Sequence, residues 1–229
     1  MINNFSKYQI ATTLAIFFHT VGLMGILFFN KDFFIQATPF NLLLSAVLLF
    51  YTQAEKSRHF FVFATIVFFV GFTVEMIGVN TGKLFGQYNY GTMLGFKWKN
   101  VPVIIGLNWF IIIYCCGVCL NTFLMKIINR VAADNNETPK ALKAMSVIVD
   151  GATLAVLFDW LMEPVAVKLG YWQWNNGEIP IYNYLCWFII SLCLLAVFHF
   201  SKFDKQNKFA VNLLLIQLMF FLILRTFLK

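Results

Sequence analysis

Long apolar stretches separated by short polar segments are the feature that most constrains this chain. In hydrocarbon every backbone N–H and C=O group must bond within its own segment, so a stretch of about 17–25 apolar residues crosses a bilayer as a helix. The composition agrees, because 60% of the residues are hydrophobic and 12% are charged. We therefore predict an all-α fold, a polytopic transmembrane helical bundle of about seven spans that forms a single integral membrane domain over residues 1–229. The predicted spans are 8–29, 39–54, 60–79, 101–125, 142–167, 184–200 and 209–227.

Charges between the spans predict the orientation. The first apolar run begins after seven residues and lacks a clear small-residue cleavage site, which favours a signal anchor. With the N-terminus inside, the cytoplasmic segments hold ten Lys and Arg residues and the opposite side holds seven, so we expect a cytoplasmic N-terminus. Anionic head groups account for these basic loops, and the net charge of +7 therefore does not indicate a nucleic-acid partner.

Four carboxylic acids lie within the apolar stretches: Glu75, Asp150, Asp159 and Glu163. A carboxylate in hydrocarbon costs several kcal/mol or takes up a proton, so residues of this kind indicate a functional site. Asp159 and Glu163 are one helical turn apart and project from nearly the same face. Two carboxyl groups in a shared dry site repel each other, which favours the protonated form of one of them near neutral pH. The pair offers a proton donor beside a proton acceptor.

Helix geometry predicts that three of these carboxyls share one depth. Glu75 lies about 22 Å along its span and Asp159 about 25 Å along a span that runs the same way, with Glu163 about one turn further. All three are expected in the outer half of the bundle. Asp150 lies about 13 Å deeper than Asp159 and on the opposite face. A structural role for Asp150 is favoured slightly over a proton relay.

Two aromatic loops follow the carboxyls. The segment 78–95 carries glycines at positions 78, 82, 86, 91 and 95, which permit tight turns and close backbone approach. Its aromatic residues predict an apolar lid or a re-entrant segment buried within the protein. The segment 170–174 carries Tyr171, Trp172 and Trp174, for which an interfacial aromatic belt is an equally good interpretation.

Polar residues elsewhere in the spans add candidates. Asn108 and Trp109 in the fourth span, and Asn183 and Trp187 at the start of the sixth, could orient a water molecule or cap a helix end. Asn108 has a simpler explanation, because asparagine often joins transmembrane helices by hydrogen bonds.

These residues resemble a known family, the bacterial and archaeal carotenoid 1',2'-hydratases with the related bisanhydrobacterioruberin hydratases. The similarity covers residues 75–187 in ordered blocks. Two positions depart from the family pattern: Phe158 stands where the family has Trp, and Glu163 stands where it has Asp. The Glu keeps the carboxyl but moves it by a methylene. The blocks are Glu75-x-x-Gly78-Val79-x-Thr81-Gly82-x-x-Phe85-Gly86-x-Tyr88-x-Tyr90, Leu94-Gly95, Val101-Pro102, Phe158-Asp159-Trp160-x-x-Glu163-Pro164, Gly170-Tyr171-Trp172-x-Trp174 and Pro180-x-x-Asn183-Tyr184-x-x-Trp187.

The resemblance implies a carotenoid 1,2-hydratase, a cofactor-independent lyase of a bacterial or archaeal cytoplasmic membrane. It would add water to the terminal double bond of an acyclic ψ end group, as in lycopene or γ-carotene. We expect Asp159 to act as the acid and Glu75 and Glu163 as the base and water-positioning pair. Nearby aromatic rings can stabilise the tertiary cation. The residues expected to bind substrate are Tyr88, Tyr90, Asn108, Trp109, Trp160, Trp172, Trp174, Asn183 and Trp187.

Partners implied by this activity are a lipophilic carotenoid, water, the lipid bilayer and other carotenoid-biosynthesis enzymes. No cofactor or metal is expected, since hydration is redox-neutral. The alternative is a proton-coupled transporter, because intramembrane carboxylates also carry protons, although the sequence shows no internal repeat. A retinal-binding protein would need a Lys deep in the last span, and 209–227 contains none. An iron oxygenase would need a His cluster, and His19, His59 and His199 lack ligand spacing.

Overall fold

The computed structural model describes residues 5–131 and 140–228, and it confirms the all-α polytopic fold. The segment between the predicted spans 101–125 and 142–167 therefore lies partly outside the described residues. The helices are α1 (Lys7–Phe28), α2 (Lys31–Gln36), α3 (Thr38–Thr52), α4 (Arg58–Thr81), α5 (Ile104–Val131), α6 (Lys140–Met145), α7 (Gly151–Lys168), α8 (Ile181–Phe200) and α9 (Lys208–Phe227).

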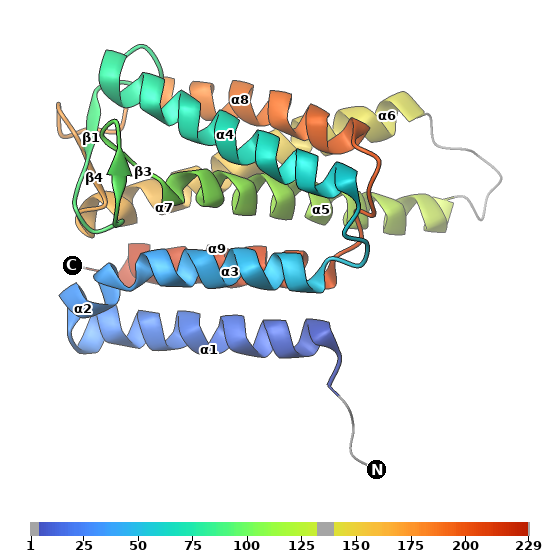
Figure 1. The fold of residues 1–229 in the computed structure, drawn as a ribbon, viewed down its shortest axis with the longest axis horizontal. Helices are drawn as coiled ribbons and strands as arrows, with labels where there is room; N and C mark the ends of the chain where they lie inside the picture. Colours follow the sequence, from blue (N-terminus) through green and yellow to red (C-terminus); the bar gives the residue numbers. More distant parts are fainter. Residues whose placement is uncertain (1–4, 132–139, 229) are drawn as a thin grey trace.

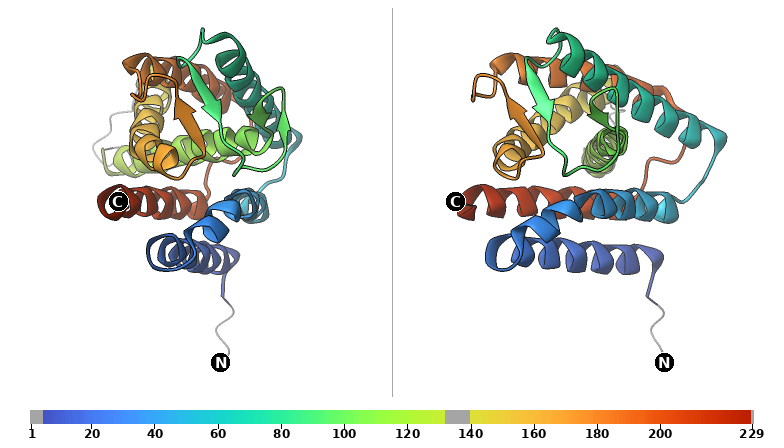
Figure 2. Two further views of the ribbon diagram at one scale, coloured as in Figure 1. Left: turned by 90° about the vertical axis from the view of Figure 1, so that its left-hand side faces the viewer. Right: turned by 60° about the vertical axis from the view of Figure 1, so that its left-hand side comes forward.

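The long helices lie side by side along the long axis of the molecule (Figure 1). α5 is the central helix, since it packs against α3, α4, α7, α8 and α9. α1 lies at one edge of the bundle, where it packs against α3 and α9 (Figure 2). Helix α1 begins and helix α9 ends at opposite ends of the bundle (Figure 1).

Six of the described helices are long and apolar enough to cross a membrane, and α3 is a shorter apolar helix. This pattern agrees with a bundle of about seven spans and identifies a membrane protein. Several boundaries differ from the prediction by a few residues, and two of the differences have a visible structural cause. The segment expected to be a connector at Lys31 begins the short helix α2, which Asn30 caps by accepting a hydrogen bond from the N–H of Phe33. The predicted span 101–125 begins later, at Ile104, because Val101–Pro102 forms a strand.

Helix α7 continues a π-helical turn, Ser146–Asp150, and contains Pro164. Asp150 is exposed, and its Oδ2 accepts a hydrogen bond from Ser146 Oγ at 2.5 Å. It therefore lies away from the other three acidic residues, which are buried.

Two small antiparallel sheets close the end of the bundle that follows α4 and α7 (Figure 1). Strand β1 (Tyr88–Tyr90) pairs with β4 (Trp172–Trp174), and β2 (Lys97–Trp98) pairs with β3 (Val101–Pro102). The two aromatic loops of the sequence thus meet as one sheet, with Tyr88 opposite Trp174 and Tyr90 opposite Trp172. The lid prediction for 78–95 did not include this pairing.

Candidate active site

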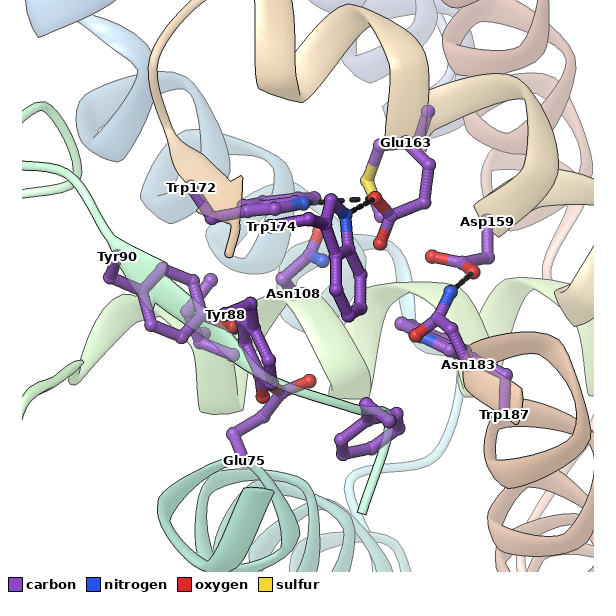
Figure 3. Close-up of a pocket in the computed structure, with 13 residues that line it drawn as sticks. Glu75, Tyr88, Tyr90, Asn108, Asp159, Glu163, Trp172, Trp174, Asn183 and Trp187 are labelled. Atoms are coloured by element: carbon purple, nitrogen blue, oxygen red, sulfur yellow. Dashed lines mark hydrogen bonds between the residues drawn. The ribbon is translucent and has the colours of Figure 1, made fainter. Parts of the chain in front are cut away.

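A buried pocket lies beneath the β1–β4 sheet, at the end of α4 and α7. Figure 3 shows Glu75 on α4 at one side of this pocket and Asp159 and Glu163 on α7 at the other. The cavity that these side chains enclose is small, about 20 Å³, which is room for about one water molecule. Its lining residues, among those the structure describes, include three carboxylic acids and no Lys, Arg or His. They are Glu75, Phe85, Tyr88, Tyr90, Ile105, Asn108, Asp159, Met162, Glu163, Trp172, Trp174, Asn183 and Trp187.

Glu75 is held by three donors. Its Oε2 accepts hydrogen bonds from Tyr88 Oη at 2.5 Å and Tyr90 Oη at 2.8 Å, and its Oε1 accepts one from Trp109 Nε1 at 3.0 Å. Hydrogen bonds of this kind favour the charged form of a carboxyl group and offset part of the cost of its burial. Helix α4 ends soon after this residue, at Gly82 with φ 65°, a left-handed conformation that glycine adopts without strain. The chain can then turn back, which brings Tyr88 and Tyr90 next to Glu75.

Glu163 is held on one oxygen only. Its Oε2 accepts from Trp172 Nε1 and from Trp174 Nε1, both at 3.0 Å. Among the described residues, no donor bonds Glu163 Oε1. That oxygen is therefore left to interact with a molecule in the pocket.

Asp159 has the fewest partners of the three and is completely buried. Its Oδ2 accepts a hydrogen bond from Asn183 Nδ2 at 2.8 Å, as Figure 3 shows. Its Oδ1 has no hydrogen-bond partner among the described residues. An ionised Asp159 would bury an unpaired negative oxygen, which is costly, whereas a protonated carboxyl carries no such charge.

Strand alternation explains how one small sheet supplies four donors. Successive side chains of a strand point to opposite faces, so Tyr88 and Tyr90 share one face with Trp172 and Trp174. Their rings also pack in pairs, with centroids 5.0 Å apart for Tyr88–Trp174 and 5.8 Å apart for Tyr90–Trp172. Burial, and then the charge of Glu75, raise the pKa of both Tyr88 and Tyr90 well above the usual value. Both hydroxyls therefore stay protonated and keep donating at neutral pH.

An aromatic stack forms the wall behind Glu75. The rings of Trp109 and Trp187 lie 3.9 Å apart and are inclined by 10°. Gly71 makes room for this stack, because a Cβ atom there would lie 2.4 Å from the ring of Trp109. Trp187 lines the pocket, whereas Trp109 lies behind it and reaches the site through its bond to Glu75.

The structure gathers most of the predicted site residues. All three candidate catalytic carboxyls line the pocket, with Tyr88, Tyr90, Asn108, Trp172, Trp174, Asn183 and Trp187. Trp160 does not, because it follows Asp159 by one position and so projects from another face of α7. Its side chain is 46% exposed and stacks with Arg225 at 3.8 Å from the guanidinium carbon to the ring centroid.

Three lining residues were not expected: Phe85, Ile105 and Met162. Phe85 belongs to the glycine-punctuated motif, and Met162 is next to Glu163, so both could have been found from their neighbours. Ile105 carries no chemical signal, and only the packing of α5 places it here.

The fold and the pocket define a polytopic membrane protein with a carboxylate site closed by aromatic residues. The chain matches the model of the carotenoid biosynthesis protein family over residues 37–229, and it belongs to that family. It is also similar to the bisanhydrobacterioruberin hydratase of Haloarcula japonica, with 25% identity over 141 residues. That alignment covers 58% of this chain and 42% of the relative, so the chain matches less than half the length of that protein. No solved structure matches the chain.

Proposed function

We propose that this protein is a carotenoid hydratase that adds water to the terminal 1,2 double bond of an acyclic ψ end group. Lycopene and γ-carotene are the proposed substrates. The observation that carries this proposal is a single buried pocket with three carboxyls, each with a different set of hydrogen-bond donors. The membership of the carotenoid biosynthesis family and the similarity to a carotenoid hydratase support it.

Asp159 is the proposed proton donor. Its Oδ1 is buried and unpartnered, so the neutral acid is the form that this oxygen accommodates at least cost. Asn183 orients the carboxyl through Oδ2. The proton of Asp159 is transferred to C2, the less substituted carbon of the double bond, and the π electrons form the new C–H bond. A tertiary cation remains at C1.

Glu75 and the aromatic wall stabilise that cation. The three donors on Glu75 favour its charged form, in which it would supply a fixed negative charge to the pocket. The ring of Trp187, backed by Trp109, presents a π face to the same space. Neither group needs to move or exchange a proton for this role.

Glu163 is the proposed base. Two tryptophans hold its Oε2, which leaves Oε1 to accept a proton from the attacking water. The water oxygen bonds to C1 and its proton goes to Glu163. Transfer of that proton back to Asp159, one helical turn away, restores the starting state. The sum is addition of one water with no change of oxidation state, so the reaction consumes no oxidant or reductant.

The size of the pocket sets a condition for binding an end group. Its cavity of about 20 Å³ holds about one water molecule, so the lining side chains must move apart before the terminus of a polyene can enter. The rest of such a molecule would lie among the apolar helices or lipid. This arrangement fits a substrate that resides in the bilayer.

The test is pigment analysis in bacterial hosts that accumulate lycopene or γ-carotene. We expect the wild-type protein to give a product heavier by one water. Asp159→Asn has nearly the same size and can still accept the hydrogen bond from Asn183, but it has no carboxylic acid. We therefore expect hydration to fall by about a hundredfold or more. Glu163→Gln and Glu75→Gln should each also reduce it.

Membrane insertion of each variant is the control for this test. The proposal is wrong for these substrates if well-inserted wild-type protein leaves the pigment unchanged in both hosts. It is wrong about the acid if Asp159→Asn hydrates as fast as the wild type.

A further inference from the structure

Pro164, directly after Glu163, interrupts the hydrogen-bond ladder of α7. In an α-helix the carbonyl of residue 160 accepts from the N–H of residue 164, and proline has no N–H. The carbonyl of Trp160 therefore loses its helical donor. It lies directly after Asp159, and Glu163 lies directly before the proline.

Arg225 of α9 replaces that donor. Its Nη1 donates to the carbonyl oxygen of Trp160 at 2.6 Å, and its guanidinium stacks on the Trp160 ring at 3.8 Å. The two contacts come from one side chain to the backbone and ring of one residue. A planar guanidinium can make both at once, because its N–H groups lie in the plane that stacks on the ring.

Position within the helix does not explain these contacts. Arg225 lies in the last turn of α9, where a cation interacts favourably with the helix dipole and can extend toward the membrane surface. Either effect would be satisfied by a side chain directed away from α7. The observed side chain instead reaches across to the one carbonyl that Pro164 leaves without a helical donor.

We propose that Arg225 is a positioning residue for the carboxylate pair of α7. By bonding the free carbonyl it holds the turn 159–164 in one conformation. That turn sets the distance of Asp159 from Asn183 and of Glu163 from its two tryptophans. This inference rests on the proposed function for its effect on catalysis, but the contact itself has a readout that does not depend on activity.

A double-mutant cycle between Arg225→Met and Pro164→Ala tests the inference. Arg225→Met keeps a long side chain at this position but removes the hydrogen-bond donor and the positive charge. We expect it to lower hydration by about tenfold and to lower the Tm of the purified protein in detergent by about 2–4 °C. Pro164→Ala restores the N–H of residue 164, so Arg225→Met in that background should have little effect on Tm. Additive effects on Tm would overturn the proposal.

Two further variants keep the result interpretable. Arg225→Lys retains a cation and a donor, and it should restore part of the Tm and of the hydration lost in Arg225→Met, even if Pro164→Ala does not fold. Equal losses for Lys and Met would also overturn the proposal. Lys208→Ala, at the other end of α9, is the matched control and should change neither quantity.

The two readouts separate this inference from the proposed function. Coupling in Tm without hydration by the wild type would contradict the function and leave the Arg225 contact supported. Hydration by the wild type without coupling in Tm would support the function and reject the role of Arg225.

Discussion

At the residue scale, the three buried carboxyls differ in the donors that reach them. Glu75 has three, Glu163 has two on the same oxygen and Asp159 has one. A carboxylate is stabilised by each donated hydrogen bond, so the three groups are suited to different protonation states in one apolar pocket. This difference is the physical basis for the proposed roles of acid, base and fixed charge.

Removal of one donor from Glu163 is the first prediction. Trp172→Phe keeps an aromatic ring but loses the bond to Glu163 Oε2. A hydrogen bond to a charged group contributes about 1.5–3 kcal/mol, so we expect hydration to fall by about tenfold or more. Pigment analysis of cells with equal amounts of inserted protein measures this change.

The neighbouring residue Tyr171 provides the matched control. Its hydroxyl bonds Thr38 Oγ1 at 2.5 Å, and it bonds no carboxyl group among the described residues. Tyr171→Phe therefore also loses one hydrogen bond but should leave hydration close to that of the wild type. Equal losses in the two variants would show that the bond to Glu163 has no special role.

At the scale of elements, the site depends on close contact between helix α4 and strand β1. Gly78 faces Tyr88 there, and a Cβ atom at this position would lie 2.9 Å from Tyr88 Oη and 2.9 Å from the ring of Phe85. The strands themselves are only three residues long, so their pairing alone is weak support. The hydrogen bonds to the carboxyls beneath the strands and the packing of helix α4 beside them supply the remaining stabilisation.

Substitution of this glycine is the second prediction. Gly78→Ala should displace Tyr88 from Glu75, with an overpacking cost of about 1–3 kcal/mol. We expect a lower Tm and hydration reduced by about tenfold. Gly22→Ala in α1 is the control, because its added Cβ would meet only Phe220, at 3.9 Å. Alanine there should be neutral or slightly stabilising, as helix propensity predicts. A Gly78→Ala protein as stable and active as Gly22→Ala would contradict this account of the contact.

At the scale of the whole molecule, the number of helices that cross the bilayer decides on which side of the membrane the site lies. The six long apolar helices and the shorter α3 alternate in direction, so α1 begins and α9 ends at opposite ends of the bundle (Figure 1). If α3 crosses the bilayer, the two ends of the chain face opposite sides. If α3 only enters the bilayer, the ends face the same side.

Reporter fusions test this third prediction. We expect reporters at the two ends of the chain to lie on opposite sides, with the N-terminal one cytoplasmic. A reporter in the connector 201–207, which joins α8 to α9, should be on the same side as the N-terminus. Reporters at both ends on one side would show that α3 does not cross.

Local sequence determined the spans and the depth of the site. The apolar lengths predict the helices, and a rise of 1.5 Å per residue places Glu75 and Asp159 at similar depths before any contact is known. This prediction needs only a bilayer of constant thickness. The four-residue spacing of Asp159 and Glu163 likewise places them on one face, and both line the pocket.

Only the tertiary structure decided how the carboxyls are distinguished. Tyr88 and Trp174 are opposite each other in a sheet although the sequence separates them widely, and no periodicity along the chain encodes that pairing. The outward position of Trp160 under Arg225 likewise depends on how α7 and α9 pack. Helix formation and depth follow from local hydrogen bonds and the bilayer, whereas the donors of each carboxyl come from segments that meet only after folding.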